Sequence, residues 1–199
     1  MKITNNISFG KTLVATCQFN MSDRDTSRCK IFELDSTEDK DYFAKLRDNP
    51  LWHGNKFLWS MDNLMKEGCI GNSNDTFSLE NNEGECLGYI SVITHAKPYN
   101  KKFIYSLETA PNYSEKKKES TNHIGHSLVA FIIAQAEQEN REQVSTLAFD
   151  KDTKNFFKRH CGFKTGYESG YDCVLEQKYY FKFLEKYKEK VGNEIKFIA

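Results

Sequence analysis

The sequence predicts an α/β domain of the α+β kind: a mixed, mostly antiparallel central sheet flanked by helices, with an extra helix at the C-terminus. Three observations predict this class. The chain has 199 residues, 39% of them hydrophobic, which is enough to bury a core. The spacing of hydrophobic residues changes repeatedly between helical and alternating. A helix also stands between two strands in the second half, which requires one parallel crossover in a sheet otherwise built from hairpins.

Runs of alternating hydrophobic residues predict the strands. The turn sequence NNEGE at 81–85 joins two of them into a hairpin, and a turn at Ser169-Gly170 joins the last two. Residues 22–28 are predicted to form a loop. In chain order, the predicted strands are 12–19, 30–35, the two around the first turn within 75–96, 102–109, 143–150 and the two around the second turn within 163–176.

Hydrophobic residues at helical spacing predict the helices. Asn49-Pro50 ends the first helix and Gly68 ends the second, because proline and glycine are both typical of helix ends. Pro111 ends the strand that precedes the third helix. In chain order, the predicted helices are 41–48, 55–68, one that begins near His123, 152–160 and 178–191.

The bulk properties indicate one intracellular domain with extensions: 1–29 as an N-terminal extension, 30–176 as the domain, and 177–199 as a C-terminal helix packed on it or extending it. Basic and acidic residues number 28 each, so charge gives no reason to expect nucleic acid or an acidic membrane as partner. No run approaches the roughly 20 apolar residues of a membrane span. The N-terminus lacks the basic start and apolar stretch of a signal peptide. We therefore expect a cytoplasmic protein, with secretion by a non-classical route left open.

The six cysteines give no metal-binding signature. None forms a CxxC pair, and none stands at zinc-ligand spacing with histidine apart from the adjacent His160-Cys161. We expect reduced thiols and no metal site.

Three local motifs occur in a fixed order. The first is Glu85-Cys86-Leu87-Gly88-Tyr89-Ile90-Ser91-Val92, the second is Leu107-Glu108-Thr109-Ala110-Pro111-Asn112-Tyr113, and the third is Asn155-Phe156-Phe157-Lys158-Arg159-His160-Cys161-Gly162-Phe163-Lys164. They resemble, respectively, the third strand, the end of the fourth strand and the late Gly-Phe helix end of the GCN5-related N-acetyltransferase (GNAT) superfamily. Together the motifs cover about residues 30–176.

The resemblance implies that acetyl-coenzyme A is the co-substrate and that an amine-bearing molecule is the acceptor. In such proteins two central strands part, and backbone groups near Leu107 and Thr109 then pair with the pantetheine arm as an added strand does. The helix start receives the pyrophosphate, and the late helix also contributes to the coenzyme site. The cofactor-binding residues implied in this way are Leu107, Thr109, Asn122, His123, Ile124, Gly125, His126, Ser127, Asn155 and Phe157.

The predicted phosphate site departs from the family's pattern, which is Arg/Gln-x-x-Gly-x-Gly/Ala. Here Ser120 begins that segment, His123 replaces the first glycine, and only Gly125 remains. A helix start binds anions through its unpaired N–H groups alone. Two interpretations stay open. Either the lysines at 116–118 and the His123 ring supply the missing contacts, or the lysine segment is a solvated loop and Asn122 only caps a core helix.

Transfer to an amine needs a base, and the candidate residues lie on the predicted strand 102–109. Glu108 is the only acid there and stands just before the bulge that the resemblance implies. Tyr105 occupies a position where relatives often carry an acid. The alternatives are an exposed or ion-paired carboxylate for Glu108 and a core aromatic for Tyr105. Phe157 or Lys158 stands where relatives often carry a proton-donating tyrosine, because His160-Cys161 adds one residue before Gly162.

The leading functional hypothesis is an acetyl-CoA-dependent N-acyltransferase that transfers an acetyl group directly to an amine, with a homodimer left open. The first alternative is a degenerate protein of the same fold that binds coenzyme A or a protein partner without turnover. The second is an unrelated α+β interaction domain.

Overall fold

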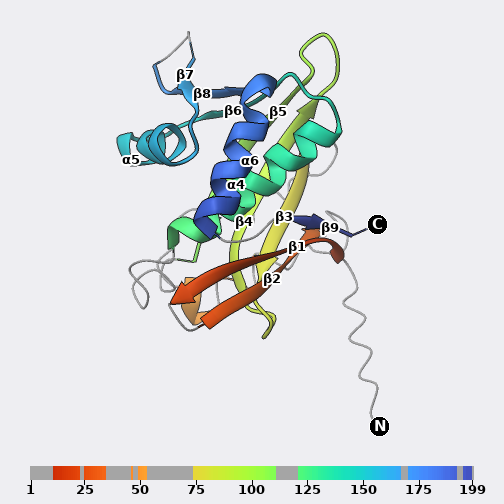
Figure 1. The fold of residues 1–199 in the computed structure, drawn as a ribbon, viewed down its shortest axis with the longest axis vertical. Helices are drawn as coiled ribbons and strands as arrows, with labels where there is room; N and C mark the ends of the chain where they lie inside the picture. Colours follow the sequence, from red (N-terminus) through yellow and green to blue (C-terminus); the bar gives the residue numbers. More distant parts are fainter. Residues whose placement is uncertain are drawn as a thin grey trace.

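The computed structural model describes residues 11–22, 25–34, 46, 49–52, 74–110, 121–166, 170–191 and 195–198. Within these residues nine strands form one sheet flanked by helices (Figure 1). The strands are β1 (Lys11–Ser22), β2 (Asp25–Leu34), β3 (Asn74–Glu80), β4 (Cys86–His95), β5 (Lys101–Thr109), β6 (Gln143–Leu147), β7 (Lys164–Thr165), β8 (Asp172–Glu176) and β9 (Lys196–Phe197). Their order across the sheet is β7-β8-β6-β5-β4-β3-β2-β1-β9.

The helices lie between and after the later strands. The described helices are η1 (Pro50–Trp52), α4 (Thr121–Gln138), α5 (Lys151–Asn155), η2 (Phe156–His160), η3 (Gln177–Tyr179) and α6 (Tyr180–Val191). The predicted helices 41–48 and 55–68 lie outside the described residues, apart from the helical Leu46.

The predicted fold class is confirmed. Strands β5 and β6 are parallel and are connected through α4, whereas every other pairing in the described sheet is antiparallel. The hairpin around 81–85 forms as predicted, with Asn81 N–H bonded to the carbonyl of Glu85 at 3.0 Å. Hairpins therefore build the sheet on both sides of a single parallel crossover.

The N-terminal strands differ from the prediction. A loop was expected over 22–28, but β1 extends to Ser22, β2 begins at Asp25, and these two residues pair with each other. Backbone pairing with β1 therefore extends β2 through the polar residues 25–28, whose sequence does not alternate between hydrophobic and polar. Because β1 pairs with β2 along the hairpin and with β9 on its other side, residues 11–22 form an added strand of the same sheet. A boundary after residue 29 falls inside β2.

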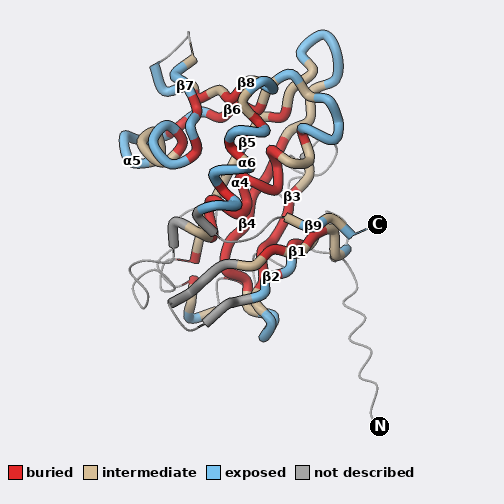
Figure 2. Tube along the Cα trace, viewed as in Figure 1, coloured by how far each residue is buried: buried red, intermediate tan, exposed pale blue. Residues whose placement is uncertain are grey.

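Helix α4 is the centre of the core. It begins at Thr121 rather than near His123, so Asn122 lies within its first turn and is not the capping residue. Every residue from Ile124 to Ile133 is buried, because the sheet covers one side of the helix and α6 packs on another (Figure 2). The hydroxyls of Ser127 and Tyr187 form a buried hydrogen bond of 2.9 Å between α4 and α6.

A buried lysine fixes the far end of α4 to β5. Lys102 is 1% exposed, and its Nζ donates to Gln135 Oε1 at 2.9 Å and pairs with Glu139 Oε1 at 2.9 Å. Arg141 Nε donates to the other carboxylate oxygen of Glu139 at 2.8 Å. Burial opposes ionisation of Glu139, but the hydrogen bonds from Lys102 and Arg141 outweigh it, so the pKa of this carboxyl lies below its ordinary value.

We predict that Glu139→Gln lowers the free energy of unfolding at pH 7 by about 0.5–1 kcal/mol, a modest value because solvent screens the partly exposed carboxylate. Since the pKa is lower in the folded state, this stabilisation is present above the unfolded-state pKa and disappears as pH falls through the folded-state value. Urea unfolding between pH 3 and pH 7 measures the difference. The neighbouring exposed Glu142→Gln is the control. If the difference in unfolding free energy between wild type and E139Q keeps its pH 7 value down to pH 3, the ion-pair assignment is contradicted.

Candidate functional site

Strand β5 is paired on one side along its whole length but on the other side along only part of it. Its pairing with β6 joins Lys101–Ile104 to Gln143–Thr146 and ends there. Its pairing with β4 continues to Thr109. The backbone edge of residues 105–109 that faces β6 therefore has no partner in that strand. The two strands part after Ile104, so Leu107 and Thr109 lie in the segment that β6 does not cover.

A β-bulge marks the point where the strands part. Ser106 pairs with Ser91 and Ile104 pairs with Val92, so Tyr105 is the extra residue on β5. A bulge bends the strand that carries it and increases its twist. The bulge was expected just after Glu108, and that prediction is wrong: residues 107–109 pair one-to-one with residues 88–90. The bend lies instead next to Ile104, where β5 leaves its parallel neighbour.

Tyr105 is not a core aromatic. Its side chain is 40% exposed. On the other side of the opening, β6 and the residues after it carry Leu147 and Phe149, which are 44% and 75% exposed. Because Tyr105 and Leu147 each follow the last β5–β6 pair, apolar side chains flank the opening on both strands.

Glu108 lies on the face of the sheet opposite α4. It pairs with Tyr89, and directly opposed residues in an antiparallel pair point to the same side. The neighbouring Gly88 faces α4, so Tyr89 and Glu108 face away from it. Burial raises the pKa of the Tyr89 phenol, and the nearby negative charge of Glu108 raises it further. Trp52 stacks on Tyr89 with ring centroids 5.7 Å apart, which makes this face aromatic around the carboxylate.

Gly88 brings the start of α4 onto the open end of β5. A Cβ at this position would lie 2.8 Å from Cγ2 of Ile124 and 2.9 Å from the carbonyl oxygen of Glu108. Only glycine permits so close an approach between the helix and the strand. The first turn of α4, whose N–H groups have no partners within the helix, therefore lies over the end of β5.

The side chains at the start of α4 mostly serve packing. The ring of Phe156 lies 3.1 Å from where a Cβ of Gly125 would be, so this glycine accommodates an aromatic ring. His126 is buried and its Nε2 donates to the carbonyl of His160 at 3.2 Å. Ser127 bonds to Tyr187 of α6. His123 is half-buried. The side chain of Asn122 and the lysines at 116–118 lie outside the described residues.

The predicted helix 152–160 is two shorter segments. Helix α5 ends at Asn155, which is half-buried, and η2 is a π-helical turn in which Cys161 N–H bonds to the carbonyl of Phe156 at 3.2 Å. A π-turn accommodates one extra residue in a helix. It takes up the residue that His160-Cys161 adds before Gly162.

Phe157 lies in the core. It is 2% exposed and packs edge-to-face on Phe163 with ring centroids 5.2 Å apart. Its place among buried aromatic rings follows from the π-turn, which directs it inward.

Sequence reasoning missed two features of the site. The role of Gly88 had a signal, since a glycine inside a strand marks close backbone approach. The position of the bulge had none, because it depends on the register between β4 and β5.

Two further observations concern metals and membranes. Among the described residues no group of three or more His, Cys, Asp or Glu side chains is placed to hold a metal ion. Within the same part of the chain, no helix is both long and apolar enough to cross a membrane.

Comparison with known proteins finds relatives in structure only. No family model matches the sequence, and no curated protein matches it. Spermidine N-acetyltransferase from Vibrio cholerae in complex with CoA and spermine is similar in structure, with a TM-score of 0.53, 13% identity, and coverage of 77% of this chain and 98% of that one. A Desulfovibrio desulfuricans protein assigned to the GNAT acetyltransferases has a TM-score of 0.56 at 12% identity, over 75% and 99% of the two chains.

We predict that Gly88→Ala lowers the free energy of unfolding by about 1–3 kcal/mol, because the added methyl group meets the helix and a backbone carbonyl. Gly125→Ala is the matched control. Its methyl group meets only the tip of a half-buried ring, and alanine gains about 0.5–1 kcal/mol over glycine within a helix. Its net effect should therefore be small. Urea unfolding measures both, and equal losses in the two variants would contradict the close approach at Gly88.

Proposed function

We propose that this chain, which has the fold of the GNAT acetyltransferases, is an acetyl-CoA-dependent N-acyltransferase that transfers an acetyl group directly to an amine. One observation carries the proposal: the backbone edge of β5 from Tyr105 to Thr109 is left unpaired by β6, directly beneath the first turn of α4. A strand edge that β6 does not cover and a helix start lie side by side, which suits an extended molecule with an amide-containing arm and a phosphate group.

The strand edge supports the binding of the pantetheine arm. Such an arm carries amide groups, and an open strand edge offers N–H and C=O groups that pair with them as a neighbouring strand does. Leu107 and Thr109 are the residues on this edge that we assign to coenzyme binding. Exposed Tyr105, Leu147 and Phe149 give the opening apolar walls.

The helix start supports the binding of the pyrophosphate. The N–H groups of the first turn, including those of Asn122, His123 and Ile124, carry the partial positive charge of the helix dipole. Gly125 contributes space for the Phe156 ring, so we assign the phosphate contacts to the backbone of the first turn. Asn155 stands at the end of α5 next to η2, which packs on this helix start.

Glu108 is the proposed general base. It lies on β5 within the segment 105–109, which pairs with β4 but not with β6, on the face that carries Tyr89 and Trp52, opposite α4. The acceptor amine approaches from that face, where Glu108 takes its proton directly or through one water molecule. A backbone N–H between Leu107 and Thr109 donates to the thioester carbonyl oxygen.

The leaving thiolate needs little assistance. Phe157 has no proton to donate and lies in the core. Free thiols titrate near ~8.5, so a thiolate is a tolerable leaving group at neutral pH. The phenol of Tyr105, half-exposed at the bulge, is the second group that we assign to proton transfer in this site.

The second candidate function is coenzyme binding without turnover. Two observations favour it: Phe157 replaces a proton donor with a core residue, and the Phe156 ring covers Gly125, the one glycine that remains of the phosphate pattern. Binding and turnover experiments separate the two.

We predict saturable binding of acetyl-CoA in isothermal titration, and release of free thiol when amines are added. The amine panel begins with spermidine and spermine, because the structurally similar Vibrio cholerae enzyme binds spermine. Binding without thiol release across the panel would favour the non-catalytic alternative. No binding at millimolar acetyl-CoA would remove both.

Glu108→Gln is expected to lower kcat by about 10²–10⁴-fold, the usual contribution of general acid–base catalysis, while the dissociation constant for acetyl-CoA stays unchanged. Tyr105→Phe is expected to lower kcat less. The exposed Glu83→Gln in the hairpin turn is the control and should retain wild-type rates. A Glu108→Gln enzyme with an unchanged rate across pH would exclude that residue as the base.

A further inference from the structure

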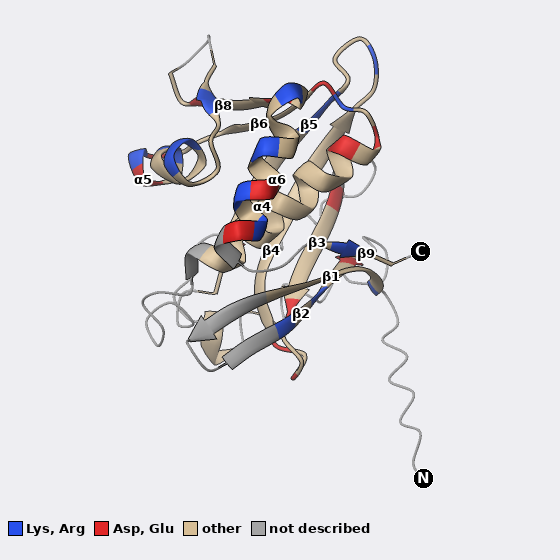
Figure 3. Ribbon diagram, viewed as in Figure 1, with Lys and Arg blue, Asp and Glu red and all other residues tan. Residues whose placement is uncertain are grey.

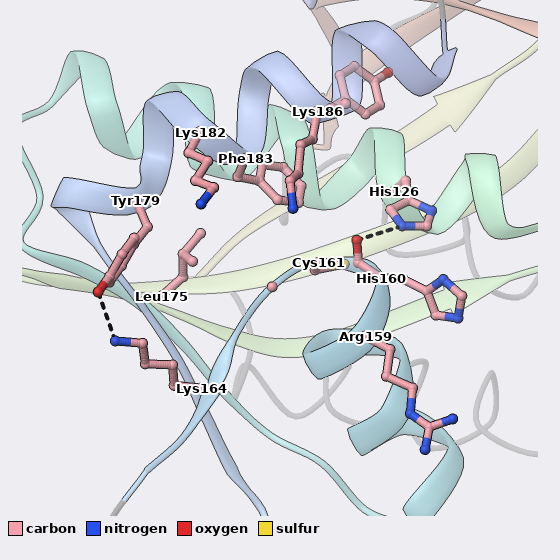
Figure 4. A pocket seen from close by; sticks show the side chains of 12 residues that line it. His126, Arg159, His160, Cys161, Lys164, Leu175, Tyr179, Lys182, Phe183 and Lys186 are labelled. Atoms are coloured by element: carbon pink, nitrogen blue, oxygen red, sulfur yellow. Dashed lines mark hydrogen bonds between the residues drawn. The ribbon is translucent and has the colours of Figure 1, made fainter.

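A cavity of about 430 Å³ lies away from the open edge of β5, between α6, η2 and β8 (Figure 4). We call it the α6 pocket, because α6 and the residue before it supply five of its 12 lining residues: Tyr179, Lys182, Phe183, Lys186 and Tyr187. Its size is within the range of small-molecule sites, roughly 300–1,000 Å³.

The inner surface of the α6 pocket is apolar. Leu175 of β8, Phe183 and Tyr187 of α6, and Cys161 after η2 line it, and each of the four is at most 7% exposed. In Figure 4 Leu175 lies left of centre, below Lys182 and beside Tyr179. This surface accepts the flat or aliphatic part of a ligand without requiring hydrogen bonds.

The rim of the α6 pocket is cationic. Arg159, Lys164, Lys182 and Lys186 line it, and none of the 12 lining residues is acidic. Lys164 donates to the Tyr179 hydroxyl at 2.9 Å and lies 4.0 Å from Glu176. Within the described part of the chain, Arg159, Lys182 and Lys186 form no ion pair. Figure 3 shows basic residues along α6 and at the segment that follows α5.

Lys182 and Lys186, which have no ion-pair partner among the described residues, both extend from α6 toward the cavity (Figure 4) and repel each other. Lys182 and Lys186 are one turn apart on the same face of α6, a spacing at which like charges destabilise a helix. An anion in the pocket relieves that repulsion and accepts charge-assisted hydrogen bonds from both lysines, whereas the Arg159 side chain extends away from them (Figure 4). The overall charge of the chain is zero, so this local positive charge reflects the placement of these residues on two separate elements.

The α6 pocket is separate from the proposed coenzyme site. No residue of β5 lines it, and among the residues of the α4 start only His126 does. The Phe156 ring packs against both Gly125 and His126, with the His126 and Phe156 ring centroids 5.2 Å apart. This aromatic ring therefore stands between the first turn of α4 and the α6 pocket.

We propose that the α6 pocket binds a nucleoside phosphate, with the base on Leu175 and Phe183 and the phosphate groups between Lys182 and Lys186. The apolar inner surface distinguishes this ligand class from inorganic phosphate, and the cationic rim distinguishes it from an uncharged nucleoside.

Isothermal titration with ATP tests the proposal. We expect saturable binding that weakens as salt is raised. Lys182→Gln/Lys186→Gln should weaken it by about tenfold or more, the usual effect of losing charge-assisted contacts, and Arg159→Gln should weaken it less, because that side chain extends away from the two lysines. The exposed pair Lys30→Gln/Lys196→Gln removes the same charge elsewhere and should bind ATP as the wild type does. Thermal unfolding of each variant confirms that it is folded.

Two further titrations test the ligand class and the separation of the sites. Adenosine and inorganic triphosphate should each bind at least about tenfold more weakly than ATP. The Lys182→Gln/Lys186→Gln variant should bind acetyl-CoA with the wild-type dissociation constant. Absence of ATP binding, unchanged ATP binding by K182Q/K186Q, or equal binding of inorganic triphosphate would overturn the proposal. A parallel loss of acetyl-CoA binding would overturn the separation. If wild-type protein binds ATP but no acetyl-CoA, the proposed function fails and the α6 pocket stands.

Discussion

The bend of β5 at Tyr105 is the constraint on which the candidate site depends. A sheet normally pairs both edges of an interior strand, but β5 loses β6 after Ile104 and keeps β4 to Thr109. The extra residue at the bulge lets β5 turn away from β6 without breaking its register with β4 beyond that point. The result is an interior strand that pairs with β6 over residues 101–104 but not over residues 105–109.

Helix α4 acquires its position from contacts at both ends. At its C-terminal end, buried Lys102 ties Gln135 and Glu139 to β5. At its N-terminal end, Gly88 lets the first turn lie directly on β4 and β5, and the Phe156 ring packs on Gly125. A helix held in this way presents the N–H groups of its first turn over the strand edge that β6 leaves uncovered. The function that we propose therefore depends on backbone groups more than on the side chains of a phosphate-binding motif.

The sequence predicted the elements that follow from local patterns and missed those that depend on pairing. The NNEGE turn and the switch in hydrophobic spacing were sufficient for the hairpin and the single parallel crossover. Register is a property of two strands, so the bulge at Tyr105 and the pairing of polar residues 25–28 left no trace in either strand alone. The extra residue at His160-Cys161 could be seen in the sequence. The π-turn that accommodates it, with Phe157 packed on Phe163, could not be predicted, because it depends on tertiary packing. The α6 pocket joins residues from four segments and had no local signal.

Amide hydrogen exchange along β5, measured with and without acetyl-CoA, tests most directly whether the open edge of this strand receives the coenzyme. If the pantetheine arm pairs with the edge as an added strand, exchange within 105–109 and at the first turn of α4 slows on binding, whereas exchange within 101–104, already paired with β6, changes little. Binding of acetyl-CoA with no added protection of residues 105–109 would contradict this role for the bend in β5.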